Sequence, residues 1–181
     1  MLINSQNTIG LAIDLQERLV PAMSNSNEIL TNCVKLLSGL NILSIDCIVS
    51  QQYTKGLGNS LPEIRSLFKD FNFIDKTEFS CLMNKEFLKT LTSNSNLTNI
   101  IICGVEAHVC VLQSAVDLKR ANYNPIIVVD CIASRRDYDK KYAIERFKQE
   151  GICLATYESI LFEIVKSAKH ERFKDISKLI K

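Results

Sequence analysis

Several features that mark other classes of protein are missing from the sequence. No apolar run approaches the roughly 18 residues that a membrane-spanning helix needs, and the segment from Met1 to Gly10 lacks the pattern of a secretory signal. Long runs of basic residues are also absent, and 22 basic and 20 acidic side chains leave a net charge of only +2. Such an even balance argues against a nucleic-acid or anionic-membrane surface. We therefore expect neither nucleic acid nor membrane as a partner.

The seven cysteines lack the pattern of a disulfide framework. Their number is odd, no C-x-x-C pair occurs, and most of them lie inside apolar runs such as Ile100–Cys103. Thiols of this kind are typical of reduced proteins, in which cysteine packs as a small apolar side chain. We expect a cytoplasmic protein in which at most one or two cysteines are chemically special.

Histidine is scarce as well. The only two are His108 and His170, and neither belongs to a cluster of Asp and His at metal-ligand spacing. We therefore expect no metal site, and nothing in the sequence indicates another cofactor.

What the chain does contain is an alternation of short apolar runs with amphipathic stretches. The runs are rich in Ile and Val and lack polar alternation, as expected of strands buried on both faces of a parallel sheet. They are Thr8–Ile13, Leu43–Ser50, Phe71–Asp75, Thr98–Cys103, Pro125–Asp130 and Ile152–Thr156. The pattern predicts an α/β fold, in three α/β/α layers around a central six-stranded, mostly parallel sheet. No repeat or linker interrupts it, so we predict a single domain over residues 1–181.

Helical periodicity fills the gaps between these runs. One helix is predicted to start at Asn25, whose side chain would cap it together with Glu28, and to extend to about Leu40. The others are Lys85–Thr92, a helix from about His108 to Lys119, Lys140–Glu150, Glu158–Ser167 and Glu171–Ile180.

Three chemically distinctive residues follow predicted strands, at the edge where active residues of such sheets collect. Asp14 closes the first run, either as a buried carboxylate facing a cation or as a helix cap. Lys76 follows the third run, either paired with that aspartate or solvated in a loop. Cys110 falls in the first helical turn after the fourth run, where the helix dipole favours a thiolate, unless it is a buried packing residue.

Four segments carry a family resemblance: D-x-Q at Asp14, K-T-x-F-S at Lys76, G-V-E-A-x-x-C-V ending at Val111, and Gln51–Gly58 followed by Leu61–Ile64. The first three resemble the isochorismatase-like cysteine hydrolases. The fourth is similar to the subgroup called isochorismatase domain-containing proteins. The resemblance extends from about Ile9 to the C-terminus and implies the Rossmann-like isochorismatase-like hydrolase fold.

The resemblance also implies a triad of Cys110, Asp14 and Lys76. Cys110 would attack an amide or similar carbon to give a covalent intermediate. Asp14 would take the thiol proton and pass it to the leaving group, while Lys76 keeps Asp14 ionised and stabilises the thiolate. In the family a cis peptide bond commonly stands at the position of Val105–Glu106. The oxyanion donors would then be the N–H groups of Glu106 or Ala107 and of Cys110.

Five residues are expected to line the substrate pocket: Gln52, Tyr53, Phe79, Glu106 and His108. For the two aromatic residues, plain core packing is the alternative. Glu106 either touches the substrate or interacts with the helix N-terminus. His108 is expected to orient other groups or start the helix rather than act as a base.

Two departures from the family pattern bear on specificity. The subgroup usually has glutamate where this chain has Gln51, so a pocket carboxylate is lost. Nicotinamidases of the same fold hold a metal with an aspartate and two histidines near this loop, and that set is missing here. Nicotinamidase activity is therefore not expected.

Together these features predict a metal-independent hydrolase of a small amide-like or related substrate. Because relatives form dimers or larger assemblies, we also expect a homo-oligomer. Two other functions stay open. A catalytically idle α/β protein-interaction module would have no need of the three strand-end residues. A redox-sensing thiol protein would use a low-pKa Cys110 but has no resolving cysteine nearby in the sequence.

Overall fold

The central feature of the protein is one sheet of six strands, seen in a computed structural model that describes residues 3–181. Met1 and Leu2, part of the N-terminal segment considered above, lie outside the described residues. Strand order is β3-β2-β1-β4-β5-β6, and every neighbouring pair is parallel. The strands are β1 (Thr8–Ile13), β2 (Cys47–Gln52), β3 (Ile74–Lys76), β4 (Asn99–Val105), β5 (Asn124–Ala133) and β6 (Cys153–Ala155).

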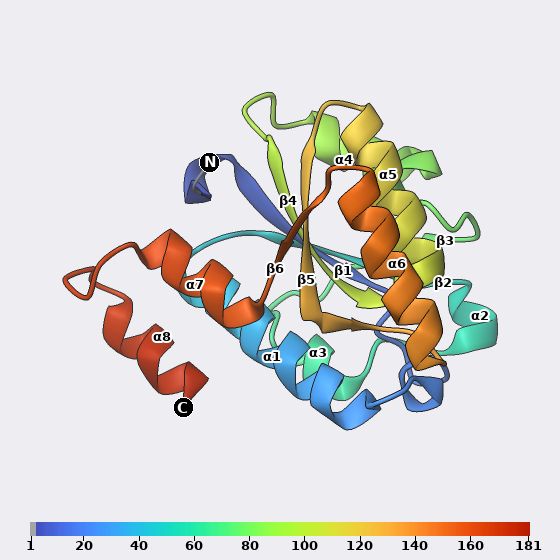
Figure 1. Ribbon diagram of the computed structural model, residues 1–181, viewed down its shortest axis with the longest axis horizontal. Coiled ribbons are helices and arrows are strands. Elements are labelled where there is room, and N and C mark those ends of the chain that lie inside the picture. The colour runs from blue at the N-terminus through green and yellow to red at the C-terminus, as the bar shows by residue number, and fades with distance from the viewer. Residues whose placement is uncertain (1–2) are drawn as a thin grey trace.

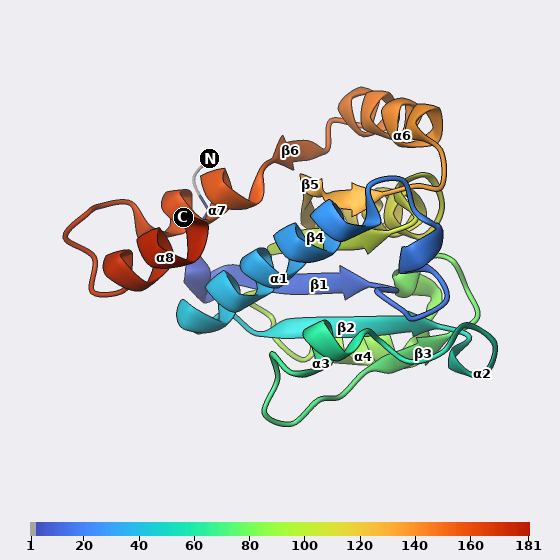
Figure 2. The same ribbon diagram turned by 90° about the horizontal axis from the view of Figure 1, so that it is seen from below.

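Helices cover both faces of this sheet and bury two separate apolar clusters against it. One face carries α1 (Ser26–Ile42), α3 (Pro62–Arg65), α7 (Tyr157–Val165) and α8 (Phe173–Ile180). The other carries α4 (Lys85–Thr92), α5 (Leu112–Arg120) and α6 (Asp137–Gln149). Figures 1 and 2 show these layers, with the short α2 (Thr54–Leu57) at one end of the molecule and α8 at the other. The predicted three-layer α/β/α architecture is confirmed.

Several predicted boundaries were wrong. Only the first strand and the helix Lys85–Thr92 match the structure at both ends. The strand predicted from Leu43 begins at Cys47, because α1 continues to Ile42 and a turn with Ser44 at φ 56° follows it. The third strand extends to include Lys76, and the fifth extends to Ala133.

The predicted cap of the first long helix was also wrong. Asn25 precedes α1 in a left-handed conformation (φ 56°), and its side chain makes no capping hydrogen bond in the described chain. Its carbonyl instead accepts the amide of Ile29. The predicted helix start at this segment is therefore correct, but Asn25 contributes only its backbone carbonyl to the first turn.

The strand order creates a switch point between β1 and β4. The chain moves outward from β1 through β2 to β3, and outward in the opposite direction from β4 through β5 to β6. Connections that diverge in this way leave a crevice at the carboxyl ends of the two central strands. Asp14 follows β1 and Glu106 follows β4, so both enter the loops at that crevice.

Close contact between β1 and β4 depends on Gly104. This residue has φ 119°, and the pairing of β4 with β5 shifts register between Ile102 and Gly104. A Cβ atom at this position would overlap the backbone carbonyl of Ile13. Only glycine both adopts this φ and lets the two backbones approach so closely.

None of the helices within residues 3–181 combines the length and apolarity that a membrane span requires.

Replacement of Gly104 by Ala should sharply reduce stability, because the new methyl group meets backbone of the adjacent central strand rather than a movable side chain. Gly151→Ala is the matched control: Gly151 also has positive φ (66°), but a Cβ there meets nothing within 4 Å. That control should lose only about 1–2 kcal/mol, the cost of a left-handed non-glycine residue. Urea unfolding measures both, and equal losses would contradict the close-approach argument.

Candidate active site

A buried ion pair lies at the carboxyl ends of β1 and β3. Asp14 follows β1 with φ 54°, and its amide donates to the carbonyl of Ser50 on β2 (3.1 Å). Lys76 is the last residue of β3, and its Nζ lies 2.8 Å from Oδ2 of Asp14. Asp14 is fully buried and Lys76 is 2% exposed, so Lys76 is no solvated loop residue.

Hydrogen bonds occupy every polar position of this pair. The second carboxylate oxygen of Asp14 accepts the hydroxyl of Ser50 (2.7 Å). Lys76 Nζ has three acceptors: Asp14 Oδ2, Gln52 Oε1 at 2.6 Å and the carbonyl of Glu78 at 3.4 Å. Because the Asp14 carboxylate bonds side chains, the helix-cap alternative for Asp14 is wrong.

Cys110 lies beside the pair, in a wide turn that leads into α5. The turn η4 (Ala107–Val111) is a π-helical segment rather than the first turn of a regular α-helix. Cys110 is 6% exposed, its Sγ lies 4.0 Å from Oε1 of Gln52, and the carboxylate of Asp14 is close enough to act on the pKa of the thiol. The structure thus brings together the three side chains that the sequence singled out at positions 14, 76 and 110.

The electrostatics of Cys110 differ from the expectation of a thiolate. Burial raises the pKa of the thiol to about 12, and the charge of Asp14 acts in the same direction while Lys76 opposes it. Burial alone would lower the pKa of Lys76, but the nearby Asp14 raises it above its usual value. The resting site therefore holds an ammonium and a protonated thiol. The predicted low pKa of Cys110 was wrong, because burial and Asp14 outweigh Lys76 and the helix terminus.

The backbone around Cys110 has a distinctive geometry. The Val105–Glu106 peptide bond is cis, at the position for which the family resemblance implies one. The carbonyl of Glu106 accepts the amides of both Val109 (3.0 Å) and Val111 (3.2 Å). These two hydrogen bonds close the turn that carries Cys110.

The side chains of Glu106 and His108 are engaged with the loop after β5. Glu106 Oε1 lies 3.4 Å from Nη2 of Arg135, and Glu106 Oε2 accepts the Arg135 amide at 3.4 Å. His108 Nδ1 lies 2.9 Å from Oγ of Ser134. Glu106 thus pairs with a cation on the neighbouring loop, a partner that sequence reasoning did not name.

Tyr53 and Phe79 lie at the surface, whereas Gln51 is buried. Tyr53 and Phe79 are each 51% exposed, so the alternative of plain core packing is wrong for both. Gln51 is fully buried, donates to Ser60 Oγ (3.0 Å) and accepts from Thr54 Oγ1 (2.8 Å). Its amide therefore stabilises the β2–α2 loop, and the loss of a carboxylate there does not act on the crevice directly.

Two residues of the site were missed from the sequence. Ser50 bonds Asp14, and the buried thiol of Cys81 lies 3.7 Å from the Ser50 hydroxyl. The Cys81 amide in turn donates to Ser114 Oγ (2.9 Å) on α5, one turn after Cys110. A second thiol is thus near the site in space, although not in sequence. For Ser50 a signal existed, since it is the polar end of a predicted strand.

Within residues 3–181, no three His, Cys, Asp or Glu side chains come together in a way that would hold a metal ion.

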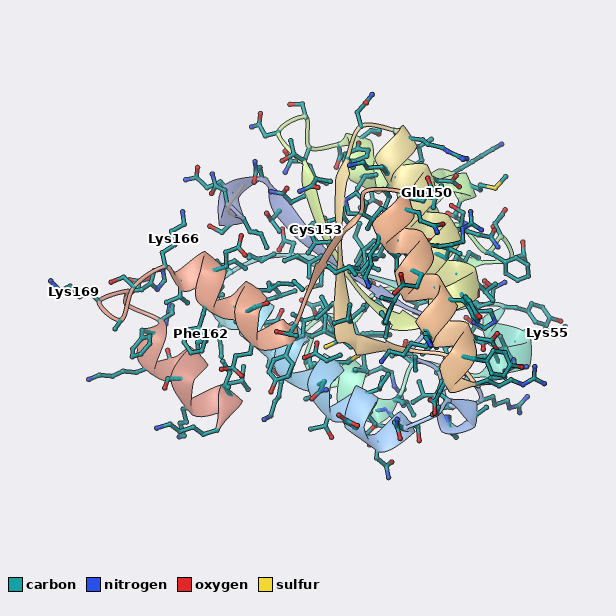
Figure 3. The ribbon with its side chains drawn as sticks, in the orientation of Figure 1. Lys55, Glu150, Cys153, Phe162, Lys166 and Lys169 are labelled. Carbon is teal, nitrogen blue, oxygen red and sulfur yellow. The ribbon has the colours of Figure 1, made fainter. Side chains whose placement is uncertain are left out.

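The thiol's environment predicts the response of Cys110 to alkylation. Asp14→Asn should lower the pKa of the Cys110 thiol by about one unit or more, because a nearby negative charge is removed. Lys76→Met should raise the pKa of Cys110 above its wild-type value, because a nearby positive charge is removed. Iodoacetamide labelling against pH, read for the Cys110 peptide by mass spectrometry, measures both shifts. Cys153, an exposed thiol on β6 (Figure 3), is the internal control and should be labelled faster than Cys110 at pH 8. Identical Cys110 curves in all three proteins would contradict the contact.

Comparison with known proteins agrees with this geometry. Residues 8–159 match the family model of the isochorismatase domain. The chain is 33% identical to isochorismatase domain-containing protein 2 of Danio rerio, covering 98% of this chain and 89% of that one. It is 36% identical to isochorismatase domain-containing protein 1 of Salmo salar, covering 96% of this chain but only 61% of the salmon protein.

Solved structures show the same fold. The MAR1 ribonuclease of Caenorhabditis elegans is 35% identical, with a TM-score of 0.93 over 99% of this chain and 92% of the nematode chain. The YcaC protein of Escherichia coli, described as an octameric hydrolase of unknown specificity, has a TM-score of 0.93 at 19% identity, over 99% of this chain and 89% of that one. With the family model and the curated relatives, these likenesses establish that the chain belongs to the isochorismatase family.

Proposed function

We propose that the protein is a metal-independent cysteine hydrolase of a small amide or related acyl compound, with Cys110 as nucleophile. The observation that carries this proposal is the position of the Cys110 thiol beside the buried Asp14–Lys76 pair, 4.0 Å from the Gln52 oxygen that also accepts Lys76 Nζ. A nucleophile within hydrogen-bond reach of a base, which a third group orients in turn, is the arrangement that covalent catalysis requires.

The first half of the reaction forms an acyl-enzyme. The thiol proton moves to Asp14 as Cys110 Sγ attacks the carbonyl carbon, so a thiolate forms only when substrate is in place. Lys76 stabilises the negative charge that develops on sulfur. The tetrahedral intermediate then expels the amine, which takes the proton from Asp14, and a thioester on Cys110 remains.

The second half releases the acid. Water attacks the thioester and gives a proton to Asp14, and the intermediate breaks its C–S bond to release a carboxylic acid. The departing sulfur takes up the proton and the resting thiol is restored. In both halves the amides of Glu106, Ala107 and Cys110 are the proposed oxyanion donors, supported by the cis Val105–Glu106 bond and by their place at the start of the turn that carries Cys110.

The setting of the site favours a small substrate. The sulfur is almost completely buried, whereas the Tyr53 and Phe79 rings are half exposed beside the strand ends that carry Gln52 and Lys76. We assign both rings, together with Gln52, Glu106 and His108, to the substrate pocket. A thiol that is only 6% exposed is most easily reached by a compound of a few heavy atoms.

The name of the nematode relative raises RNA cleavage as a second candidate. The site favours acyl transfer instead, since phosphodiester cleavage places charge on phosphate oxygens and calls for cationic donors. The charge of Lys76 acts on the thiol, but Asp14, Gln52 and Glu78 already take the protons of its ammonium. The net charge of +2 is also low for RNA binding.

A redox-sensing role gains a candidate resolving thiol in Cys81, which lies near the site. It nevertheless requires a thiolate, because peroxide reacts with the ionised form. A thiol with its pKa raised to about 12 is poorly suited to that task. An idle interaction module would have no need of a fully hydrogen-bonded buried ion pair, whose formation carries a large desolvation cost.

We further propose that the protein self-associates and works in the cytoplasm. Self-association is supported by the octameric assembly of the Escherichia coli protein and by exposed aromatic side chains such as Tyr138 and Tyr142 on α6. The cytoplasm is supported by the seven free cysteines.

A screen of small amides, carbamoyl compounds and esters tests the proposal. The wild-type protein should release acid from at least one compound, and Cys110→Ala should reduce that rate by at least about 1,000-fold, as expected when a covalent nucleophile is lost. Cys153→Ala, which removes the exposed thiol, is the matched control and should retain full activity. Acid quenching followed by mass spectrometry should detect the acyl group on Cys110.

Three results would contradict this function. Turnover that survives in Cys110→Ala would remove the nucleophile from the reaction, and loss of turnover with EDTA would point to a metal. Cleavage of a short RNA by wild type but not by Cys110→Ala, with no amide accepted, would favour the ribonuclease alternative.

A further inference from the structure

Gln52 occupies a central place between the two groups that flank Asp14. It ends β2 and pairs in register with Lys76 at the end of β3. Its side-chain oxygen accepts Lys76 Nζ at 2.6 Å and faces the Cys110 sulfur at 4.0 Å. One oxygen atom therefore contacts both the ammonium and the thiol.

The surrounding hydrogen bonds fix the orientation of the Gln52 amide. Its Nε2 donates to the carbonyl of Thr77 at 2.8 Å, and a carbonyl accepts hydrogen bonds only. The opposite orientation would place an NH2 group against the Lys76 ammonium, donor to donor. Oε1 must therefore face Lys76 and Cys110.

The backbone of Gln52 is held just as firmly. Gln16, which is fully buried, accepts the Gln52 amide at 2.7 Å and donates to its carbonyl at 3.1 Å. The same Gln16 side chain donates to the carbonyl of Gly58 at 2.7 Å. This double contact fixes the end of β2, and with it the point from which the Gln52 side chain starts.

We propose that Gln52 is a positioning residue that holds the Lys76 ammonium against Asp14 and away from the Cys110 sulfur. This inference rests on the proposed function and adds a fourth group to the three already assigned. With Gln52 Oε1 and the Glu78 carbonyl as acceptors, only one ammonium proton is left, and it is directed at Asp14. The ammonium then steadies the base in the resting state and meets the sulfur only after the thiol proton has moved.

The neutrality of the Gln52 amide is part of this role. The charged or titratable groups that act on the thiol from neighbouring elements are Asp14 after β1, Lys76 on β3 and Cys81 before α4, while Glu106 and His108, close to Cys110 in sequence, are engaged with Arg135 and Ser134. A carboxylate in place of Gln52 would compete with Asp14 for Lys76 and oppose ionisation of the thiol. An apolar side chain would free one ammonium proton to bond the sulfur.

Opposite substitutions at this position therefore predict opposite effects. In substrate-free alkylation, Gln52→Glu should move the Cys110 pH curve upward by about one unit or more, as expected for a like charge in contact. Gln52→Leu should move the curve downward. Gln113→Glu, which adds the same charge on the exposed face of α5, is the matched control and should leave the curve in place.

Turnover of an accepted amide gives the second measurement. Both Gln52 variants should lose at least about tenfold in kcat while KM changes little: the Leu variant removes a hydrogen bond to a charged group, and the Glu variant draws the ammonium away from Asp14. A residue that only contacts substrate would instead raise KM and leave the substrate-free alkylation curves unchanged.

The inference is overturned if Gln52→Leu leaves the Cys110 curve where it is in wild type, or shifts it in the same direction as Gln52→Glu. It is also overturned if KM alone responds to either change. Absence of any amide turnover in wild type would instead count against the proposed function, and the alkylation curves would still decide the role of Gln52.

Discussion

The buried ion pair of Asp14 and Lys76 is the interaction on which the rest of the site depends. Two charges taken out of water lose more hydration than their attraction returns, unless hydrogen bonds fill their remaining positions. Here Ser50, Gln52 and the Glu78 carbonyl supply those bonds. Three adjacent strands must therefore end in register. Asp14 follows β1, Lys76 ends β3, and β2 between them contributes Ser50 and Gln52. The fold at this edge and the chemistry of the site share one constraint.

The Cys110 thiol beside this pair is protonated at rest, so it must lose its proton before it can act as a nucleophile. A permanently ionised cysteine would react with any electrophile or oxidant that reached it. Under the proposed function, a thiol with its pKa raised to about 12 needs a base at the moment of attack, and Asp14 is the group proposed to supply it. In that mechanism the positive charge of Lys76 has its largest effect late, when the proton has left and negative charge develops on sulfur.

The sequence predicted the layers of the fold and the three strand-end side chains, because apolar runs and turn residues are local signals. It did not predict Ser50 and Gln52 as partners of the pair, since their contacts depend on the register of β1, β2 and β3. The thiol was assigned a low pKa because a helix start is visible in sequence whereas burial is not. The capping role predicted for the Asn25 side chain was wrong for a related reason: the left-handed backbone of Asn25 is not visible in the sequence.

The hydrogen bonds of the Lys76 ammonium also bear on which residues can recognise a substrate. Since Asp14, Gln52 and the Glu78 carbonyl take its protons, Lys76 has no free donor for a ground-state substrate. Under the proposed function, substrate recognition then depends on outer residues such as Arg135 and Glu106. Arg135 lies 3.4 Å from Glu106, and the Arg135 side chain is 60% exposed. Ion pairs so exposed contribute little free energy. Under the proposed function, a charged group on a substrate can therefore replace one partner of this outer pair at small cost, whereas the buried Asp14–Lys76 pair stays fixed.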